Sequence, residues 1–239
     1  MDQYSIKGSA SSFTDYIRVQ TERTADIVRK LNLAIEESIE LTRRTLAMSR
    51  ILPLRLEEMS AEQKRVHDLV ASGPRGRVRG PLAIWLHRPA MAEHAQALGQ
   101  FCRYGSSLPP RLSELGILTL ACVWGSEYEW WAHKPLGLAA GLSDAVVDAL
   151  RDSKPPPFEQ EDEKLVYTFL TTLHETRRVP EALYARAQLL LRAEGMIDLV
   201  ALAGYYTLIS MTLNVFEIEL PDGELRELKQ ARCATGLHE

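Results

Sequence analysis

The chain has 239 residues, of which 46% are hydrophobic and 25% are charged, values ordinary for a soluble globular protein. Its net charge of −4 argues against a nucleic-acid partner, because binding nucleic acid requires clustered basic residues that neutralise phosphates. The sequence has no apolar run of roughly 18 residues and no signal-peptide pattern, so we expect a cytoplasmic protein with no membrane partner.

A long helix is predicted near the N-terminus, over residues 13–47. This stretch lacks glycine and proline, and Val28, Leu31, Ile35 and Ile39 recur at helical spacing. Charged residues flank this narrow apolar stripe, which therefore needs a partner surface. We expect the helix to dock on the main domain or on another subunit rather than to lie on a membrane, because its acidic and basic residues are mixed.

The pattern changes after this helix. Residues 51–58 are predicted to be extended, because Pro53 is disfavoured inside a helix. Ser60 is a suitable N-cap and predicts a helix that reaches about Ala71.

A loop is predicted over residues 72–81, "SGPRGRVRGP", which contain three glycines, two prolines and three arginines. Arg75, Arg77 and Arg79 could serve an anionic ligand. We expect them to be solvated instead, since that is the more common state of basic loop residues.

Helical patterns fill most of the remaining chain. Pro109 and Pro110 suit a helix start, Pro135 is expected to end or kink a helix near Lys134, and Ser143 is placed to cap another. Further helices are predicted over residues 90–104, 163–174, 180–194 and 196–216. Because few stretches alternate with period two, we predict an all-α fold.

The cysteines give no sign of a disulfide framework or a metal site. Cys102, Cys122 and Cys233 are odd in number, and none belongs to a Cys-x-x-Cys pair. Cys122 lies in the apolar run "LGILTLACVW" and is expected to be a buried small hydrophobic residue.

A group of residues suited to proton transfer lies within and just before "WGSEYEWWAHK". Ser126, Glu129 and His133 are spaced by three and four residues, so they are expected to project from one helix face. Glu114 lies twelve residues before Ser126, and a tight turn near Trp124 would bring it towards the same place. Two carboxylates and an imidazole in an apolar pocket can hold and move a proton, because crowding raises the pKa of one acid.

The aromatic residues of this stretch allow two interpretations. Trp124, Tyr128, Trp130 and Trp131 could form the apolar wall of that pocket. Alternatively, they are ordinary core residues, and Glu129 with His133 is a stabilising pair on a helix surface. Spacing alone favours the second interpretation, since short-range charge pairs are common on helices.

A family resemblance favours the pocket. Residues 108–151, "LPPRLSELGILTLACVWGSEYEWWAHKPLGLAAGLSDAVVDALR", resemble the carboxymuconolactone decarboxylase superfamily, which includes the AhpD-like alkyl hydroperoxidases. The resemblance covers about Ile51 to Gly223. It implies an all-α, AhpD-like helical bundle that assembles as a homo-oligomer, either a dimer, a trimer or a hexamer. It also implies a carboxymuconolactone decarboxylase-like domain over residues 48–239, with residues 1–47 as an N-terminal helical extension.

The resemblance also assigns positions. In the peroxidase branch a glutamate precedes a Cys-x-x-Cys pair that is followed by a histidine. Those positions fall here on Glu114, Ser126, Glu129 and His133. Because both cysteines are replaced, thiol peroxidase activity is not expected, since it needs an attacking thiolate and a resolving thiol.

The other activity of the family fits these residues better. Decarboxylation of a small cyclic lactone or carboxylic acid needs no cofactor and no metal, only an acid and a donor for the enolate oxygen. We expect Glu129 and His133 to be the acid–base pair, with Glu114 orienting or sharing the proton. The residues expected to contact the small-molecule substrate are Ser126, His87, Trp130, Arg103 and Tyr104. An arginine suits a substrate carboxylate because it can pair with it in a bidentate manner.

An alternative function stays open. The chain could be a non-catalytic AhpD-like binding or scaffold protein that kept the pocket and lost the chemistry, since it lacks the cysteine pair and carries an added N-terminal helix.

Overall fold

The computed structural model describes residues 10–46 and 49–229. Every regular element in these residues is helical, which confirms the all-α prediction. The elements are α1 (Ala10–Leu46), η1 (Leu56–Glu58), α2 (Ala61–Ser72), α3 (Pro81–Trp85), α4 (Pro89–Gln100), η2 (Phe101–Gly105), α5 (Pro110–Trp124), α6 (Glu127–Ala139), α7 (Asp144–Arg151), α8 (Glu161–Thr176) and α9 (Glu181–Val215).

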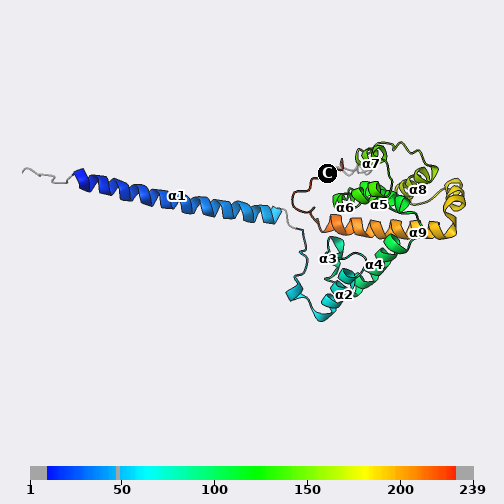
Figure 1. The fold of residues 1–239 in the computed structure, drawn as a ribbon, viewed down its shortest axis with the longest axis horizontal. Helices are drawn as coiled ribbons and strands as arrows, with labels where there is room; N and C mark the ends of the chain where they lie inside the picture. Colours follow the sequence, from blue (N-terminus) through cyan, green and yellow to red (C-terminus); the bar gives the residue numbers. More distant parts are fainter. Residues whose placement is uncertain (1–9, 47–48, 230–239) are drawn as a thin grey trace, which may run out of the picture. The chain divides into compact units, whose positions relative to one another are not determined.

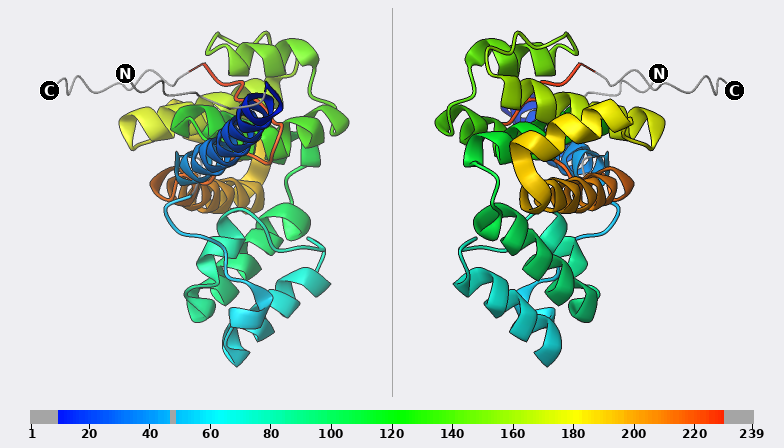
Figure 2. Two further views of the ribbon diagram at one scale, coloured as in Figure 1. Left: turned by 90° about the vertical axis from the view of Figure 1, so that its left-hand side faces the viewer. Right: turned by 90° about the vertical axis from the view of Figure 1, so that its right-hand side faces the viewer.

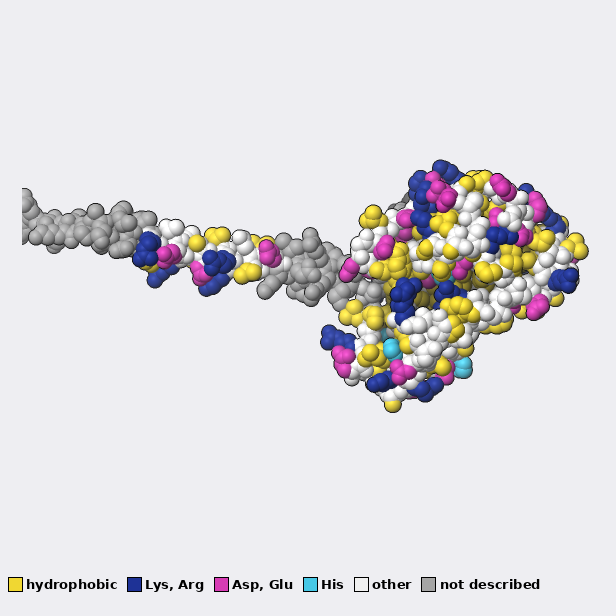
Figure 3. All heavy atoms as spheres, viewed as in Figure 1, with side chains coloured by type: hydrophobic (Ala, Val, Ile, Leu, Met, Phe, Trp, Pro, Cys, Tyr) yellow, Lys and Arg dark blue, Asp and Glu magenta, His cyan; other side chains and the backbone are white. Residues whose placement is uncertain are grey.

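The chain divides into two units, Met1–Met48 and Ser49–Glu239. In the first unit α1 is a single helix, close to the predicted range of 13–47. Val28, Leu31 and Ile35 on its apolar stripe are 50–55% exposed. Ile39, predicted to lie on the same stripe, has a side chain outside the described part of the chain. Figure 3 shows apolar and charged side chains along this helix.

Local signals set several boundaries of the second unit as predicted. Ser60 begins α2 with a capping box, in which its hydroxyl accepts from Gln63 N and its N–H donates to the Gln63 side chain. Ser143 caps α7 by accepting from Val146 N at 3.3 Å. The segment before α2 is largely extended, with a short 3₁₀ turn at η1.

Other boundaries differ from the predictions. Pro135 neither ends nor breaks α6, which continues to Ala139. A proline removes one backbone hydrogen bond from the helix. The last turn of α6 nevertheless packs closely on α5: Gly137 lies so near Leu118 that a Cβ added at Gly137 would be 3.0 Å from the Leu118 side chain. The helix predicted over 90–104 ends at Gln100 and passes into the π-helical turn η2. The helices predicted over 180–194 and 196–216 form α9, which has a kink at Arg192 (φ 57°).

The core of the second unit forms around α5, which packs against α6, α8 and α9. Leu115, Leu118 and Leu120 on α5 are fully buried. Gly116 allows close approach, since a Cβ there would lie 3.1 Å from Leu202 on α9. In Figures 1 and 2, α9 runs between two groups of helices, α2 to α4 on one side and α5 to α8 on the other.

Among the described residues, α9 is the one helix long and apolar enough to cross a membrane by length and composition. Of its apolar window, 61% is buried inside the protein. This burial is consistent with its position between the two helix groups.

Candidate functional site

The turn between α5 and α6 brings the predicted acid–base residues together. Gly125 adopts a left-handed conformation (φ 60°, ψ 34°), and Ser126 N donates to Ala121 O at 2.8 Å. Asn214 of α9 supports the turn by donating to Trp124 O at 2.7 Å. The tight turn predicted near Trp124 is therefore present, and it places α6 alongside α5.

His133 lies between two carboxylates. Its Nδ1 atom is 2.7 Å from Oε2 of Glu114 on α5, and its Nε2 atom is 3.3 Å from Oε2 of Glu129 on α6. The second contact has an ion-pair distance but not the angles of a hydrogen bond, so Glu129 Oε2 has no hydrogen-bond partner among the described residues. Glu114 is therefore the carboxylate that hydrogen-bonds the imidazole and orients it.

Burial controls the charge of this cluster. The side chains of Glu129 and His133 are each 6% exposed, and that of Glu114 is 13% exposed. Burial raises the pKa of Glu129, and the nearby His133, Arg103 and Arg75 offset part of that increase. Glu129 consequently stays protonated to a higher pH than an exposed glutamate.

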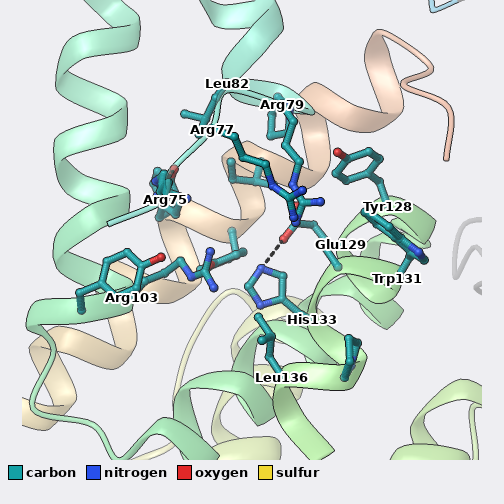
Figure 4. A pocket seen from close by; sticks show the side chains of 17 residues that line it. Arg75, Arg77, Arg79, Leu82, Arg103, Tyr128, Glu129, Trp131, His133 and Leu136 are labelled. Atoms are coloured by element: carbon teal, nitrogen blue, oxygen red, sulfur yellow. Dashed lines mark hydrogen bonds and ion pairs between the residues drawn. The ribbon is translucent and has the colours of Figure 1, made fainter. Parts of the chain in front are cut away.

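A cavity of about 470 Å³ opens beside this cluster (Figure 4). Glu129 and His133 line it, together with the predicted Arg103 and Tyr104. Glu114 is not among its lining residues and reaches it only through His133. The size suits a small molecule, and the cavity mixes apolar walls with a few polar groups, as binding sites do.

Aromatic side chains form much of the wall. The Tyr206 ring stands edge-on to His133, with centroids 5.3 Å apart. Tyr128 and Trp131 pack edge to face at 5.4 Å. Burial raises the pKa of Tyr206 well above its ordinary range, so its hydroxyl stays neutral and can donate a hydrogen bond.

The arginine loop predicted over residues 72–81 contributes to this cavity. Arg75, Arg77 and Arg79 all line it; Arg77 is exposed, as expected of a solvated loop, whereas Arg75 and Arg79 are partly buried. The loop approaches Tyr128 closely: Gly80 has φ +55°, and a Cβ there would lie 2.8 Å from the Tyr128 ring. With Arg103, four guanidinium groups surround the space beside Glu129 (Figure 4).

Three residues expected to contact substrate lie away from the cavity. His87 is exposed and donates from Nε2 to Leu52 O at 2.9 Å. Trp130 is buried and donates from Nε1 to Glu227 at 3.0 Å. Adjacent residues on a helix point in different directions, and it is Trp131 that faces the cavity. Ser126 is the N-cap of α6 rather than part of its helical face, and it lines a separate cavity of about 360 Å³.

The sequence did not place the arginine loop or the two tyrosines of α9 at this cavity, although it left open that the arginines serve an anionic ligand. The sequence did carry one signal for the loop. Its arginines occupy alternate positions, and in an extended chain alternate side chains point to the same side, so the three could face one ligand. Tyr205 and Tyr206 gave no such signal, since their position depends on how α9 packs against α5 and α6.

Comparison with known proteins gives a match only at the level of structure. No family model and no curated protein matches this sequence. An uncharacterized peroxidase-related protein from Silicibacter sp. TM1040 superposes with a TM-score of 0.59 at 10% identity, covering 72% of this chain and 91% of that one. The alkylhydroperoxidase AhpD core of an uncharacterized peroxidase-related protein from Ralstonia eutropha JMP134 superposes with a TM-score of 0.58 at 15% identity, covering 73% and 93%.

This chain has an AhpD-like fold. The structural likeness confirms the predicted fold but carries no activity with it, because one fold can host many chemistries.

The described cysteines of this AhpD-like chain lie outside the cavity. Burial raises the pKa of Cys102 to about 11 and that of Cys122 to about 12, so both thiols stay protonated near neutral pH. Cys122, predicted to be buried, is partly buried and packs against the hydrophobic core. Cys233 lies outside the described residues. Within the described chain, no group of three or more His, Cys, Asp or Glu side chains could hold a metal ion.

Proposed function

We propose that this protein is a cofactor-independent decarboxylase that acts on a small cyclic lactone or carboxylic acid by general acid–base proton transfer. The observation that carries the proposal is the placement of His133 between Glu114 and Glu129 at the wall of a cavity lined by guanidinium groups. Such a site offers a proton donor and an anion-binding surface in the same space.

The proton balance of the reaction fits this cluster. The bond between the substrate carbon and its carboxylate breaks, CO₂ leaves, and the electron pair moves into the conjugated carbonyl to form an enolate. A proton then adds to carbon and completes the product, so the enzyme must supply one proton per turnover and regain it from solvent. Glu129, whose pKa burial raises, and His133 beside it can hold that proton at the cavity wall.

The cavity walls suit the charge changes of this reaction. Arg103 and the neutral hydroxyl of Tyr206 can stabilise the enolate oxygen through donors that are already in place.

The two described cysteines argue against thiol peroxidase chemistry, although both structural neighbours are named peroxidase-related. Peroxide reduction by thiols needs a low-pKa thiolate with a second thiol beside it. Cys102 and Cys122 have raised pKa values and do not line the cavity.

The test is UV-monitored decarboxylation of γ-carboxymuconolactone by the wild type and by the Glu129→Gln and His133→Ala variants. We expect each change to lower kcat by about 10²- to 10⁴-fold, the usual contribution of a general acid. His87→Ala serves as the control, because His87 is exposed and lies away from the cavity. Undiminished turnover in both variants would overturn the proposal.

The alternative, a non-catalytic binding or scaffold protein, makes a different prediction for the same variants. It predicts no turnover by the wild type with any lactone or carboxylic acid, while small anions still bind to the cavity. Measuring binding and turnover on the same preparations separates the two functions.

A further inference from the structure

We propose that the separate cavity of about 360 Å³ at the start of α6 is a second ligand site, which takes a small α-amino acid as its zwitterion. The ligand carboxylate binds to Ser126 and to the first N–H groups of α6, and the ligand ammonium group binds to Glu217 and Glu219. The proposal goes beyond the proposed function and does not rest on it, because no residue of the acid–base cluster lines this cavity.

The hydroxyl of Ser126 is the observation that points to a ligand. Ser126 is 1% exposed and lines this cavity, and its Oγ atom has no hydrogen-bond partner among the described residues. At the N-cap of a helix a serine hydroxyl ordinarily accepts from a backbone N–H of the first turn, as Ser60 and Ser143 do in this chain, but Ser126 does not. Because a buried hydroxyl without a partner is costly, it is suited to a partner that a ligand supplies.

The first turn of α6 adds two donors to the same wall. Glu127 and Tyr128 line the cavity, and their backbone N–H groups have no acceptor in the described part of the chain, since Ser126 does not cap them. Free N–H groups at a helix N-terminus, together with the helix dipole, favour an anionic group of a ligand. We therefore assign the ligand carboxylate to this buried end of the cavity.

Carboxylates line the more exposed end of the cavity. The side chains of Glu217 and Glu219 are 56% and 41% exposed. Glu217 pairs with Arg50 through Oε1, and Glu219 pairs with Arg226 through Oε2. The second oxygen of each carboxylate has no ion-pair partner among the described residues. These oxygens can accept from an ammonium group, and they repel a ligand that carries only negative charge. The two ends of the cavity together favour a zwitterion.

The remaining walls set the size and polarity of the ligand. The Glu127 carboxylate is not available to it, because its two oxygens accept from the backbone N–H groups of Glu227 and Leu228. Leu213 and Ile218 give the cavity an apolar surface. A volume of about 360 Å³ has room for an amino acid with a small apolar side chain, such as valine.

Titration calorimetry on the full chain with three matched probes tests this proposal. The probes are L-valine, 3-methylbutanoate, which lacks the ammonium group, and 2-methylpropylamine, which lacks the carboxylate. L-valine should bind about tenfold or more tightly than the amine, because the amine loses the charge-assisted bonds to Ser126 and the α6 N–H groups. It should bind about threefold or more tightly than 3-methylbutanoate, a smaller difference because the ammonium contacts are exposed and screened.

Variants locate the two ends of the ligand. Ser126→Ala should weaken L-valine binding about tenfold or more. Ser210→Ala is the matched control and should change nothing, since Ser210 is also 1% exposed with an unpartnered Oγ but does not line this cavity. The double variant Glu217→Gln/Glu219→Gln should bind L-valine no more tightly than 3-methylbutanoate. Arg103→Gln alters the other cavity and should leave L-valine binding unchanged.

Several outcomes would overturn the proposal. They are no binding of L-valine, equal affinity for the three probes, or equal affinity of the Ser126→Ala and Ser210→Ala variants for L-valine. Loss of L-valine binding in Arg103→Gln would also overturn it, because the ligand carboxylate would then lie in the cavity beside His133. None of these results decides the proposed decarboxylation, which is measured separately and depends on other residues.

Discussion

At the scale of single residues, the charge of Glu129 is the quantity on which the site depends. A carboxyl with almost no exposure and no hydrogen-bond partner for Oε2 among the described residues is costly to ionise. Because ionisation is costly, Glu129 keeps its proton, and that proton lies beside the His133 imidazole, which would deliver or accept it in the proposed reaction.

We predict a pH-dependent stability difference between the wild type and Glu129→Gln. Because burial raises the pKa of Glu129, the folded chain keeps a proton that the unfolded chain releases as the pH passes the ordinary value of 4.5. The stability that neutral Glu129 contributes is complete below that value and is lost as the pH rises through the folded pKa. The variant cannot ionise there. Its melting temperature should therefore rise relative to that of the wild type as the pH increases above 4.5. A difference that does not change with pH would contradict this.

Glu114 is predicted to act by positioning His133. Glu114→Gln keeps the shape of the side chain but removes the charged acceptor 2.7 Å from Nδ1. A hydrogen bond to a charged group contributes about 1.5–3 kcal/mol, so kcat should fall by roughly 10- to 100-fold. KM should stay near its wild-type value, since Glu114 does not line the cavity. A rise in KM with unchanged kcat would instead place Glu114 in substrate binding.

At the scale of elements, two glycines test the packing of α4 on α9: Gly99 is tightly packed, and Gly204 has open space around it. A Cβ on Gly99 of α4 would lie 2.1 Å from the Tyr205 ring of α9, whereas nothing lies within 4 Å of a Cβ on Gly204. We expect Gly99→Ala to lower the free energy of unfolding by about 1–3 kcal/mol through overpacking. Gly204→Ala should raise it by roughly 0.5–1 kcal/mol, because alanine is the better helix former. Denaturant unfolding measures both, and equal effects would contradict the packing of α4 on α9.

Elements whose boundaries depend on neighbouring residues were predictable from the sequence. Ser60 and Ser143 begin their helices through bonds that span three residues, and Gly125 makes its turn by its own left-handed conformation. Pro135 lies inside α6 instead of ending it, and the last turn of α6 packs on α5. The acid–base cluster was predictable from helical spacing plus one turn. The place of the arginine loop at the cavity was not predictable, because it follows from tertiary contacts such as that of Gly80 with the Tyr128 ring.

At the scale of the whole molecule, α9 carries an apolar stripe that points to self-association. Ile197, Val200, Met211 and Val215 follow helical spacing and are 40–68% exposed. We propose that the chain forms the homo-oligomer implied by its resemblance through this stripe. Light scattering should give a mass that is a multiple of 26.9 kDa. Ile197→Asp/Val200→Asp should reduce it to 26.9 kDa without unfolding the chain, and a monomeric wild type would contradict the proposal.

The measurement that tests the central claim most directly is decarboxylation of γ-carboxymuconolactone in D₂O, with NMR analysis of the product. If the cluster on α5 and α6 delivers the proton, the wild type should place one deuterium on one face of the protonated carbon. The His133→Asn variant should lose at least about 10²-fold in rate. Two results would contradict a role for this cluster in the reaction. One is no turnover by the wild type; the other is a His133→Asn variant that reacts at the wild-type rate and gives a product with deuterium on either face of the carbon.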